Sequence, residues 1–139
     1  MAGIYDAYET DADLEKGGVS FSMGSKGTFK LARAGGANQR YKETVRKLTQ
    51  PFRRQIANGS MDPDQADALL ARAFARSVII GWEGVVDRDG NDFPFSVANA
   101  EKLLTDLPDL FADLRSLSED MNAFRREALD DEGKPSAPS

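Results

Sequence analysis

The spacing of the apolar residues changes at Gly35–Gly36, from every second position to every third or fourth. Before this point, apolar residues at 19–23 alternate with serines, and a second alternating run follows a four-residue turn at 24–27. Alternation on both sides of a glycine-containing turn is typical of a β-hairpin, which we expect over residues 17–34. A single hairpin is marginally stable in water, so this one must pack on helices or pair with another chain.

Four helices are expected after the hairpin. Apolar residues from Ala37 to Ile56 recur in steps of three and four, which predicts one helical stripe, and Pro51 should kink or break that helix. Asp62 followed by Pro63 is a typical start signal for the second helix. The predicted helices cover about residues 37–57, 62–80, 96–106 and 108–129.

The length of 139 residues is typical of one domain. We expect a flexible acidic lead-in over residues 1–16, a single globular domain over 17–129, and a disordered polar tail over 130–139. Within the domain, residues 85–95 predict a short hairpin or an ordered loop. The expected fold class is mainly α (α+β), with about four helices packed around a small N-terminal β-hairpin.

The chain contains neither cysteine nor histidine. Thiolate nucleophiles and thiolate metal sites are therefore excluded, and so is the side chain most often used as a general base or metal ligand. The acidic run at 87–92 lacks the glycine and glutamate positions of a calcium-binding loop, so we interpret it as a turn. We expect no catalytic residue, no metal and no cofactor, and hence a protein that is not an enzyme.

Basic residues are concentrated between Lys26 and Arg54, where nine of them accompany a single acidic residue. Such a segment can meet an acidic partner, contact phosphates, or pair with the acidic C-terminal helices. The chain as a whole carries a formal charge of −5, which disfavours nucleic acid as the partner, because nucleic-acid-binding domains are typically basic. The candidate electrostatic patch consists of Arg40, Arg46, Lys47, Arg53 and Arg54.

The last predicted helix carries a heptad-like apolar seam, and this pattern by itself favours the core over a partner surface. The second half of the chain also has aromatic residues beyond those in the seam, and protein interfaces use such residues as anchors. The candidate protein-binding residues are Trp82, Phe93, Phe95, Leu110, Phe111, Leu114, Leu117, Met121 and Phe124.

Several strings of residues, in their order and spacing, resemble one family. The strings are Gly18-Val19 and the segments 29–38, 47–59, 78–85, 87–90, 94–96 and 106–111. Through them the sequence resembles the tail assembly chaperones of long-tailed bacteriophages and prophages, the counterparts of the lambda tail chaperone. The resemblance extends over residues 6–127, which is most of the chain.

This resemblance implies a non-enzymatic factor that binds the tape measure protein, keeps it soluble and helps to recruit tail-tube subunits. Such proteins act in the cytoplasm of the bacterial host and are generally absent from the mature virion. The family often makes a longer product by ribosomal frameshifting, and Glu132-Gly133-Lys134 could be encoded by a slippery heptamer. The expected partners are the tape measure protein and the tail-tube protein, with self-association left open.

Two other classes of function remain as alternatives. A structural virion component, such as a tail-tube or head–tail completion protein, is disfavoured because tail-tube proteins are mainly β. A small nucleic-acid-binding regulator would use the basic segment. A membrane role is not expected, because the chain shows no signal peptide and no apolar run long enough to cross a bilayer.

Overall fold

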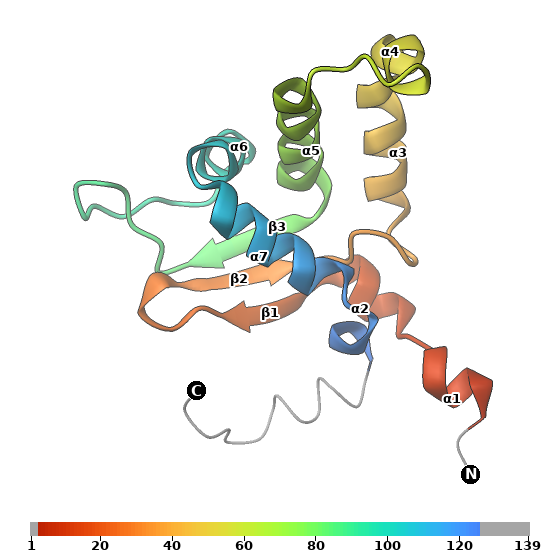
Figure 1. Ribbon diagram of the computed structural model, residues 1–139. Helices are drawn as coiled ribbons and strands as arrows, with labels where there is room; N and C mark the ends of the chain where they lie inside the picture. Colours follow the sequence, from red (N-terminus) through yellow and green to blue (C-terminus); the bar gives the residue numbers. More distant parts are fainter. Residues whose placement is uncertain (1–2, 126–139) are drawn as a thin grey trace.

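The computed structural model describes residues 3–125 as a three-stranded antiparallel sheet with helices packed on one face (Figure 1). This arrangement confirms the expected mainly α class with an N-terminal hairpin. The α-helices are α1 (Ile4–Tyr8), α2 (Ala12–Gly17), α3 (Gln39–Thr49), α4 (Arg53–Ala57), α5 (Pro63–Ser77), α6 (Val97–Asp106) and α7 (Pro108–Glu119). The strands are β1 (Val19–Ser22), β2 (Thr28–Leu31) and β3 (Ile79–Glu83), and short 3-10 turns are η1 (Gly24–Lys26), η2 (Gln50–Phe52) and η3 (Met121–Phe124).

The predicted hairpin is confirmed, and β2 pairs on its other side with a strand that we did not predict. The sheet order is β1-β2-β3. Phe21 lies opposite Phe29, and Phe29 lies opposite Trp82, so three aromatic side chains lie in one row across the sheet. The hairpin is therefore stabilised within this chain, by β3 and by the helices beneath it.

The second predicted helix is too long at its C-terminal end. The structure ends α5 at Ser77, and residues 79–80, which we expected in the helix, open β3. Val78 to Ile80 is a run of β-branched residues, which favours a strand. Pairing with β2 then stabilises the extended form, because β2 would otherwise leave one edge of its backbone unpaired.

Two other predicted helices begin close to where we expected, and each is broken before the C-terminal end that we predicted for it. The N-terminal helix is interrupted at Pro51, where η2 separates α3 from α4, as the sequence predicted. The last helix ends at Glu119, because Asp120 is extended and its carboxylate accepts the backbone N–H of Asn122, at 3.0 Å. This break directs Phe124 into the core against Phe21, with ring centroids 6.5 Å apart. The third helix confirms its prediction, with Ser96 as N-cap.

The acidic N-terminal residues are more ordered than we expected. Asp11 caps α2 by accepting the backbone N–H groups of Asp13 and Leu14. Its own N–H donates to the carbonyl of Phe124, at 2.8 Å, so α2 is attached to η3. The expected flexible lead-in over residues 1–16 thus differs from the structure at residues 12–16, while the predicted disordered tail at 130–139 lies outside the described residues.

The segment between β3 and α6 folds into the tight turn that we expected. Val86 and Asp92 form an isolated antiparallel bridge. The Asp87 carboxylate accepts the backbone N–H groups of Asp89 and Asn91, both at 2.9 Å. The acidic run is therefore held by its own backbone, and this confirms its interpretation as a turn.

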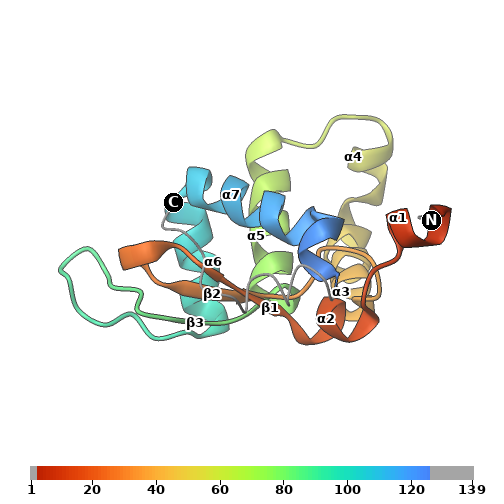
Figure 2. The same cartoon turned by 90° about the horizontal axis from the view of Figure 1, so that it is seen from below.

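The core lies between the sheet and helices α5, α6 and α7. Figure 2 views the sheet nearly edge-on, with α5 and α7 on the same side of it. The most deeply buried side chains come from each of these layers: Leu31, Phe74, Val78, Leu104, Leu114 and Phe124. The other face of the sheet carries exposed polar side chains such as Ser20 and Lys30. One face of the sheet is thus packed, and the other is solvated.

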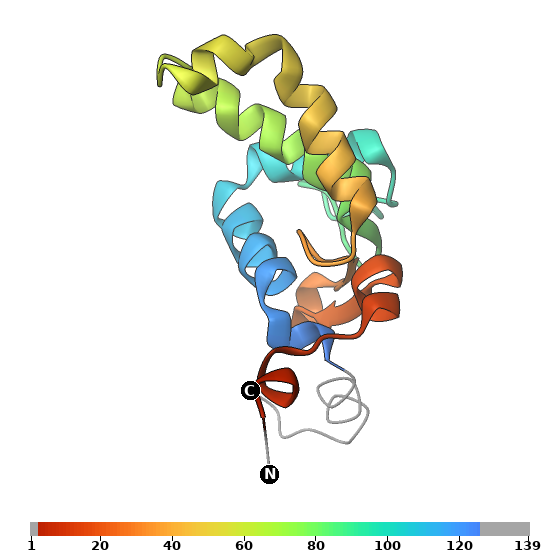
Figure 3. The ribbon, with the colours of Figure 1, turned by 90° about the vertical axis from the view of Figure 1, so that its right-hand side faces the viewer.

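Helices α3, α4 and the first half of α5 project from this body as an arm (Figures 1 and 3). The buried residues of α5 all lie between Ala71 and Ser77, and residues 63–70 of α5 include none. α3 has no buried residue at all, although it packs along α5. The arm is therefore anchored in the core only at its base.

Candidate protein-binding surfaces

The aromatic residues that we expected at a partner surface lie mostly inside the protein. Trp82 is only 9% exposed, and its indole N–H donates to the carbonyl of Phe93, at 2.7 Å. Its ring packs against Phe29, Phe93 and Phe95, with centroids 5.7, 5.9 and 5.2 Å away. Phe93 and Phe95 are half-buried. The prediction that Trp82 is a surface anchor is wrong, because β3 places the indole in the aromatic row of the sheet.

The seam of the last helix is also part of the core. Phe111, Leu114 and Phe124 are buried, and the ring of Phe111 packs edge-to-face on Phe74, 5.1 Å away. Leu110, Leu117 and Met121 are partly buried beside them. The structure therefore supports the core interpretation that the seam pattern favoured. Phe111, Leu114 and Phe124 are not exposed partner contacts, while for partly buried Leu110, Leu117 and Met121 a partner role stays a prediction. The sheet supplies the apolar surface that this seam covers.

The candidate electrostatic patch is exposed and lies along the arm. Arg40, Arg46 and Lys47 are on α3, and Arg53 and Arg54 begin α4. Arg46 and Lys47 pair with Glu43 on the same helix, with distances from the Arg46 Nη2 and Lys47 Nζ to the Glu43 Oε1 of 2.5 and 3.9 Å. The hydrogen bond from Arg46 lowers the pKa of the Glu43 carboxyl. No ion pair between this patch and the acidic C-terminal helices is found among residues 3–125. The alternative that the patch pairs with the acidic C-terminal helices is thus not observed in this part of the chain.

An apolar groove that we did not predict runs along the same arm. It lies between α3 and α4 on one side and α5 on the other, with a volume of about 210 Å³. It is lined by Val45, Leu48, Thr49, Ile56, Met61, Ala66, Leu69, Leu70 and Ala73. Ile56 is 47% exposed, and no lining residue except Ala73 is fully buried. The helical stripe predicted this apolar face, but its spacing does not show how much of the face is covered.

The base of the arm is fixed by buried polar groups. The Asn38 amide donates to the carbonyls of Arg33 and Ser77, both at 2.9 Å, and its oxygen caps α3 at Tyr41. Buried Glu15 pairs with Arg33 and accepts the backbone N–H of Ala37, at 3.1 Å. These bonds join α2, the 32–38 loop and the end of α5, so the arm has a fixed direction relative to the body.

Burial affects a titratable side chain, Tyr41, where the arm meets the core. The Tyr41 ring packs edge-to-face on Phe74, with centroids 5.6 Å apart. Desolvation raises the pKa of its phenol above the ordinary value, and the nearby charge of Glu119 adds to this effect. Tyr41 is therefore neutral at physiological pH and serves as a packing residue at the root of the arm.

Residues 3–125 include no group of three or more acidic side chains placed to hold a metal ion. The same part of the chain has no helix that is both long enough and apolar enough to span a bilayer.

A sequence model of the YdaY prophage protein family matches residues 36–134. The match covers more than half of the 139 residues. The chain belongs to the YdaY prophage protein family. In this YdaY family member, the matched part contains the whole arm, β3, α6 and α7, while β1 and β2 precede it. No curated protein and no solved structure shows significant similarity to the chain.

Proposed function

We propose that this prophage protein is a tail assembly chaperone that binds the tape measure protein, keeps it soluble and helps to recruit tail-tube subunits. Two sequence findings are consistent with this proposal. The chain belongs to a prophage family, and its sequence resembles tail chaperones over most of its length. In this proposal the protein acts by binding alone, without catalysis or cofactor, in the cytoplasm of the bacterial host, and it leaves before the virion is complete.

The observation that carries the proposal is the half-covered apolar groove of the arm. α3 has an apolar face but no buried residue, so no further element covers the apolar groove between α3 and α5 within the described residues. An eleven-residue helix such as α3 is about 16 Å long, and the groove along it therefore suits about three turns of an amphipathic helix. A long helical client exposes such faces before it assembles.

The charges at one end of the groove, at the bend between α3 and α4, favour a client helix with an acidic flank at that end. Arg46 and Arg53 line a hollow at the bend between α3 and α4, together with Thr49 and Gln50. Arg54 is exposed beside them. Basic side chains at the rim of an apolar groove increase the association rate of an acidic partner and fix its orientation.

Co-expression with the tape measure protein of the same prophage tests this function. We expect the client to stay soluble and to co-purify with the chain. Ile56→Asp should abolish co-purification, because it places a charge in the arm groove. Ile4→Asp is the matched control, since Ile4 is an exposed isoleucine of α1, far from the groove in sequence and not among its lining residues.

A client that is equally soluble with and without the chain would contradict the proposal. Detection of the chain in purified virions would instead assign it to the structural components. The exposed basic side chains of Arg53 and Arg54 carry the third alternative, a nucleic-acid-binding regulator. That alternative predicts DNA binding that weakens steeply as the salt concentration rises.

The proposal includes a longer frameshifted product that would connect the chaperone to tail-tube subunits. The codons of residues 132–134 test this part directly. A gene sequence without a slippery heptamer there would remove the frameshift and leave the binding function unaffected.

A further inference from the structure

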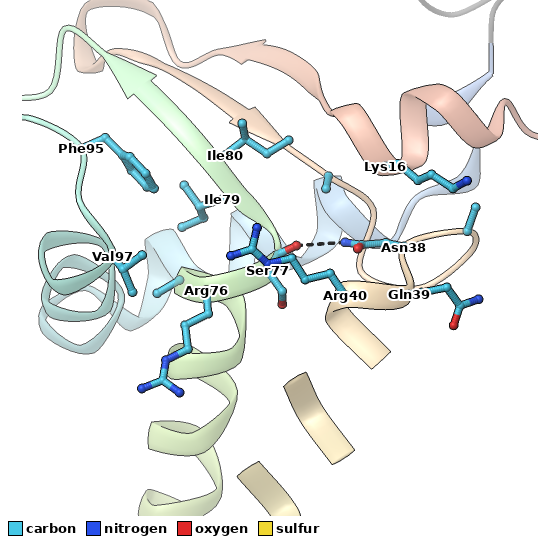
Figure 4. A pocket seen from close by; sticks show the side chains of 13 residues that line it. Lys16, Asn38, Gln39, Arg40, Arg76, Ser77, Ile79, Ile80, Phe95 and Val97 are labelled. Atoms are coloured by element: carbon cyan, nitrogen blue, oxygen red, sulfur yellow. Dashed lines mark hydrogen bonds between the residues drawn. The ribbon is translucent and has the colours of Figure 1, made fainter. Parts of the chain in front are cut away.

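A second groove lies at the base of the arm, on the side of α5 that faces β3. It has a volume of about 510 Å³ and is formed by the end of α2, the start of α3, the end of α5, the start of β3 and residues 95–97 (Figure 4). It shares no lining residue with the arm groove between α3 and α5. The two grooves therefore offer separate surfaces on one molecule.

Three cations line this second groove without a compensating acid. Figure 4 shows Arg40 extending over Ser77 towards β3, with Lys16 and Arg76 at opposite ends. None of its described lining residues is Asp or Glu, and no ion pair within residues 3–125 involves Lys16, Arg40 or Arg76. One positive charge thus lies over the hollow and two more lie at its ends.

Two buried polar residues at the groove, Glu15 and Asn38, already have partners. Glu15, next to Lys16, is buried and pairs with Arg33. The amide of Asn38 at the base of the groove bonds to Ser77, Arg33 and Tyr41. An incoming ligand therefore meets a fixed floor with its polar groups satisfied, and its recognition depends on the cations and on the apolar wall.

The apolar wall is formed by side chains that are unusually exposed for their type. Ile80 of β3 is 40% exposed and Val97 of α6 is 42% exposed, and both line the groove beside half-buried Phe95. Figure 4 shows Phe95 and Val97 on the side opposite Lys16. A ligand that fits this groove has both negative charge and apolar surface.

We infer that this groove binds an acidic segment of a partner protein. Its carboxylates would pair with Lys16, Arg40 and Arg76, and an apolar side chain of the same segment would cover Ile80 and Val97. Charge complementarity favours an acidic ligand, because the cations have no internal partner among the described residues. The aliphatic wall favours a peptide over a nucleic acid, whose phosphate backbone offers no apolar side chain. This inference does not depend on the proposed chaperone function.

Fluorescence anisotropy with the full chain tests the inference. The probe is a labelled peptide Gly-Glu-Leu-Glu-Glu-Leu-Glu-Gly, compared with the same peptide carrying Gln in place of every Glu, or Ala in place of both Leu. We expect the first peptide to bind and each altered peptide to bind at least about tenfold more weakly. Binding of the first peptide should weaken as salt is added.

Two variants locate the binding. The double substitution Arg40→Gln and Arg76→Gln should lower the affinity for the first peptide by at least about tenfold, because it removes two of the three cations. Lys26→Gln with Lys42→Gln is the matched control, as it removes two exposed cations that line neither this groove nor the arm groove. Ile80→Ser should lower the affinity for the peptide, because it removes part of the apolar wall and leaves all charges in place.

Absence of peptide binding overturns the inference, and so does an equal loss in the control variant. A single-stranded DNA of twelve nucleotides that binds more tightly, and depends on Arg40 and Arg76, would assign the groove to nucleic acid instead. Ile56→Asp should leave the peptide affinity unchanged, so a failure of this inference is distinguishable from a failure of the chaperone proposal.

Discussion

At the scale of single residues, Glu15 has more structural importance than its position in an acidic segment predicted. It is 3% exposed, pairs with Arg33 and accepts the backbone N–H of Ala37. A Cβ on Gly36 would lie 2.1 Å from its carboxylate, and Gly36 has a φ of +52°. The loop before the arm is therefore shaped around this carboxylate. Its spacing from Arg33 in the sequence gives no sign of the contact, because the two meet only after the hairpin folds.

Glu15→Ala should lower the free energy of unfolding by about 3 kcal/mol, because removing one partner leaves Arg33 and the Ala37 N–H without their acceptor. The urea midpoint measures the change. Glu43→Ala is the control, since its pairs with Arg46 and Lys47 are exposed, and its midpoint should not change measurably. Equal effects of the two substitutions would contradict the assigned role of Glu15.

At the scale of elements, the turns and helix starts follow local signals, while the pairing of strands does not. Asn38, Asp62 and Ser96 each cap a helix through a side-chain oxygen, as their residue types predict. The sheet depends on contacts between distant segments, and Gly27 shows this dependence. Its φ is +118°, and a Cβ there would lie 2.8 Å from the carbonyl oxygen of Glu83 in β3. The glycine therefore serves both the hairpin turn and the approach of β3.

Gly27→Ala should destabilise the protein by about 3 kcal/mol, through the strained backbone and the clash with β3. Gly90→Ala is the matched comparison, because Gly90 has a φ of +82° but open space around its Cβ position. It should cost about 1 kcal/mol, from backbone strain alone. Urea unfolding of both variants compares the two effects, and equal losses would show that the β3 contact does not matter.

At the scale of the whole molecule, the family match and the fold have different boundaries. The match begins at residue 36, whereas the core takes Phe21, Phe29 and Leu31 from the hairpin before it. β3 lies within the matched part but pairs with β2 outside it. The matched part by itself would therefore leave β3 without a partner and the row of aromatic residues incomplete.

A chain of residues 36–139 should not unfold cooperatively, because it lacks two of the three strands. Near-ultraviolet circular dichroism during thermal unfolding measures this, as Trp82 and its aromatic neighbours provide the signal. A chain of residues 11–139 is the control and should unfold cooperatively, since α1 contains no buried residue. A cooperative transition in the shorter chain would show that the hairpin is dispensable for the fold.

The candidate sites also differ in how far the sequence alone predicted them. The five residues of the basic patch are exposed, because charged side chains without a buried partner remain solvated in almost any packing, while their role stays a prediction. The predicted surface positions of Trp82 and Phe111 were wrong, because a buried core and a protein interface have the same helical spacing and the same content of aromatic residues. The arm groove and the groove beside β3 were missed, since each is formed by residues from separate elements.

The amino-acid sequence by itself determined where the chain turns after β1, where the helices that follow the hairpin begin, and which face of each of them is apolar. These features depend on interactions between residues a few positions apart, such as the cap at Ser96 and the break at Pro51. Only the tertiary structure decided that residues 79–83 form a strand, that Trp82 is enclosed, and that the arm keeps an open groove. Those outcomes depend on which surfaces meet after folding, and burial is a property of the assembled elements rather than of any one of them.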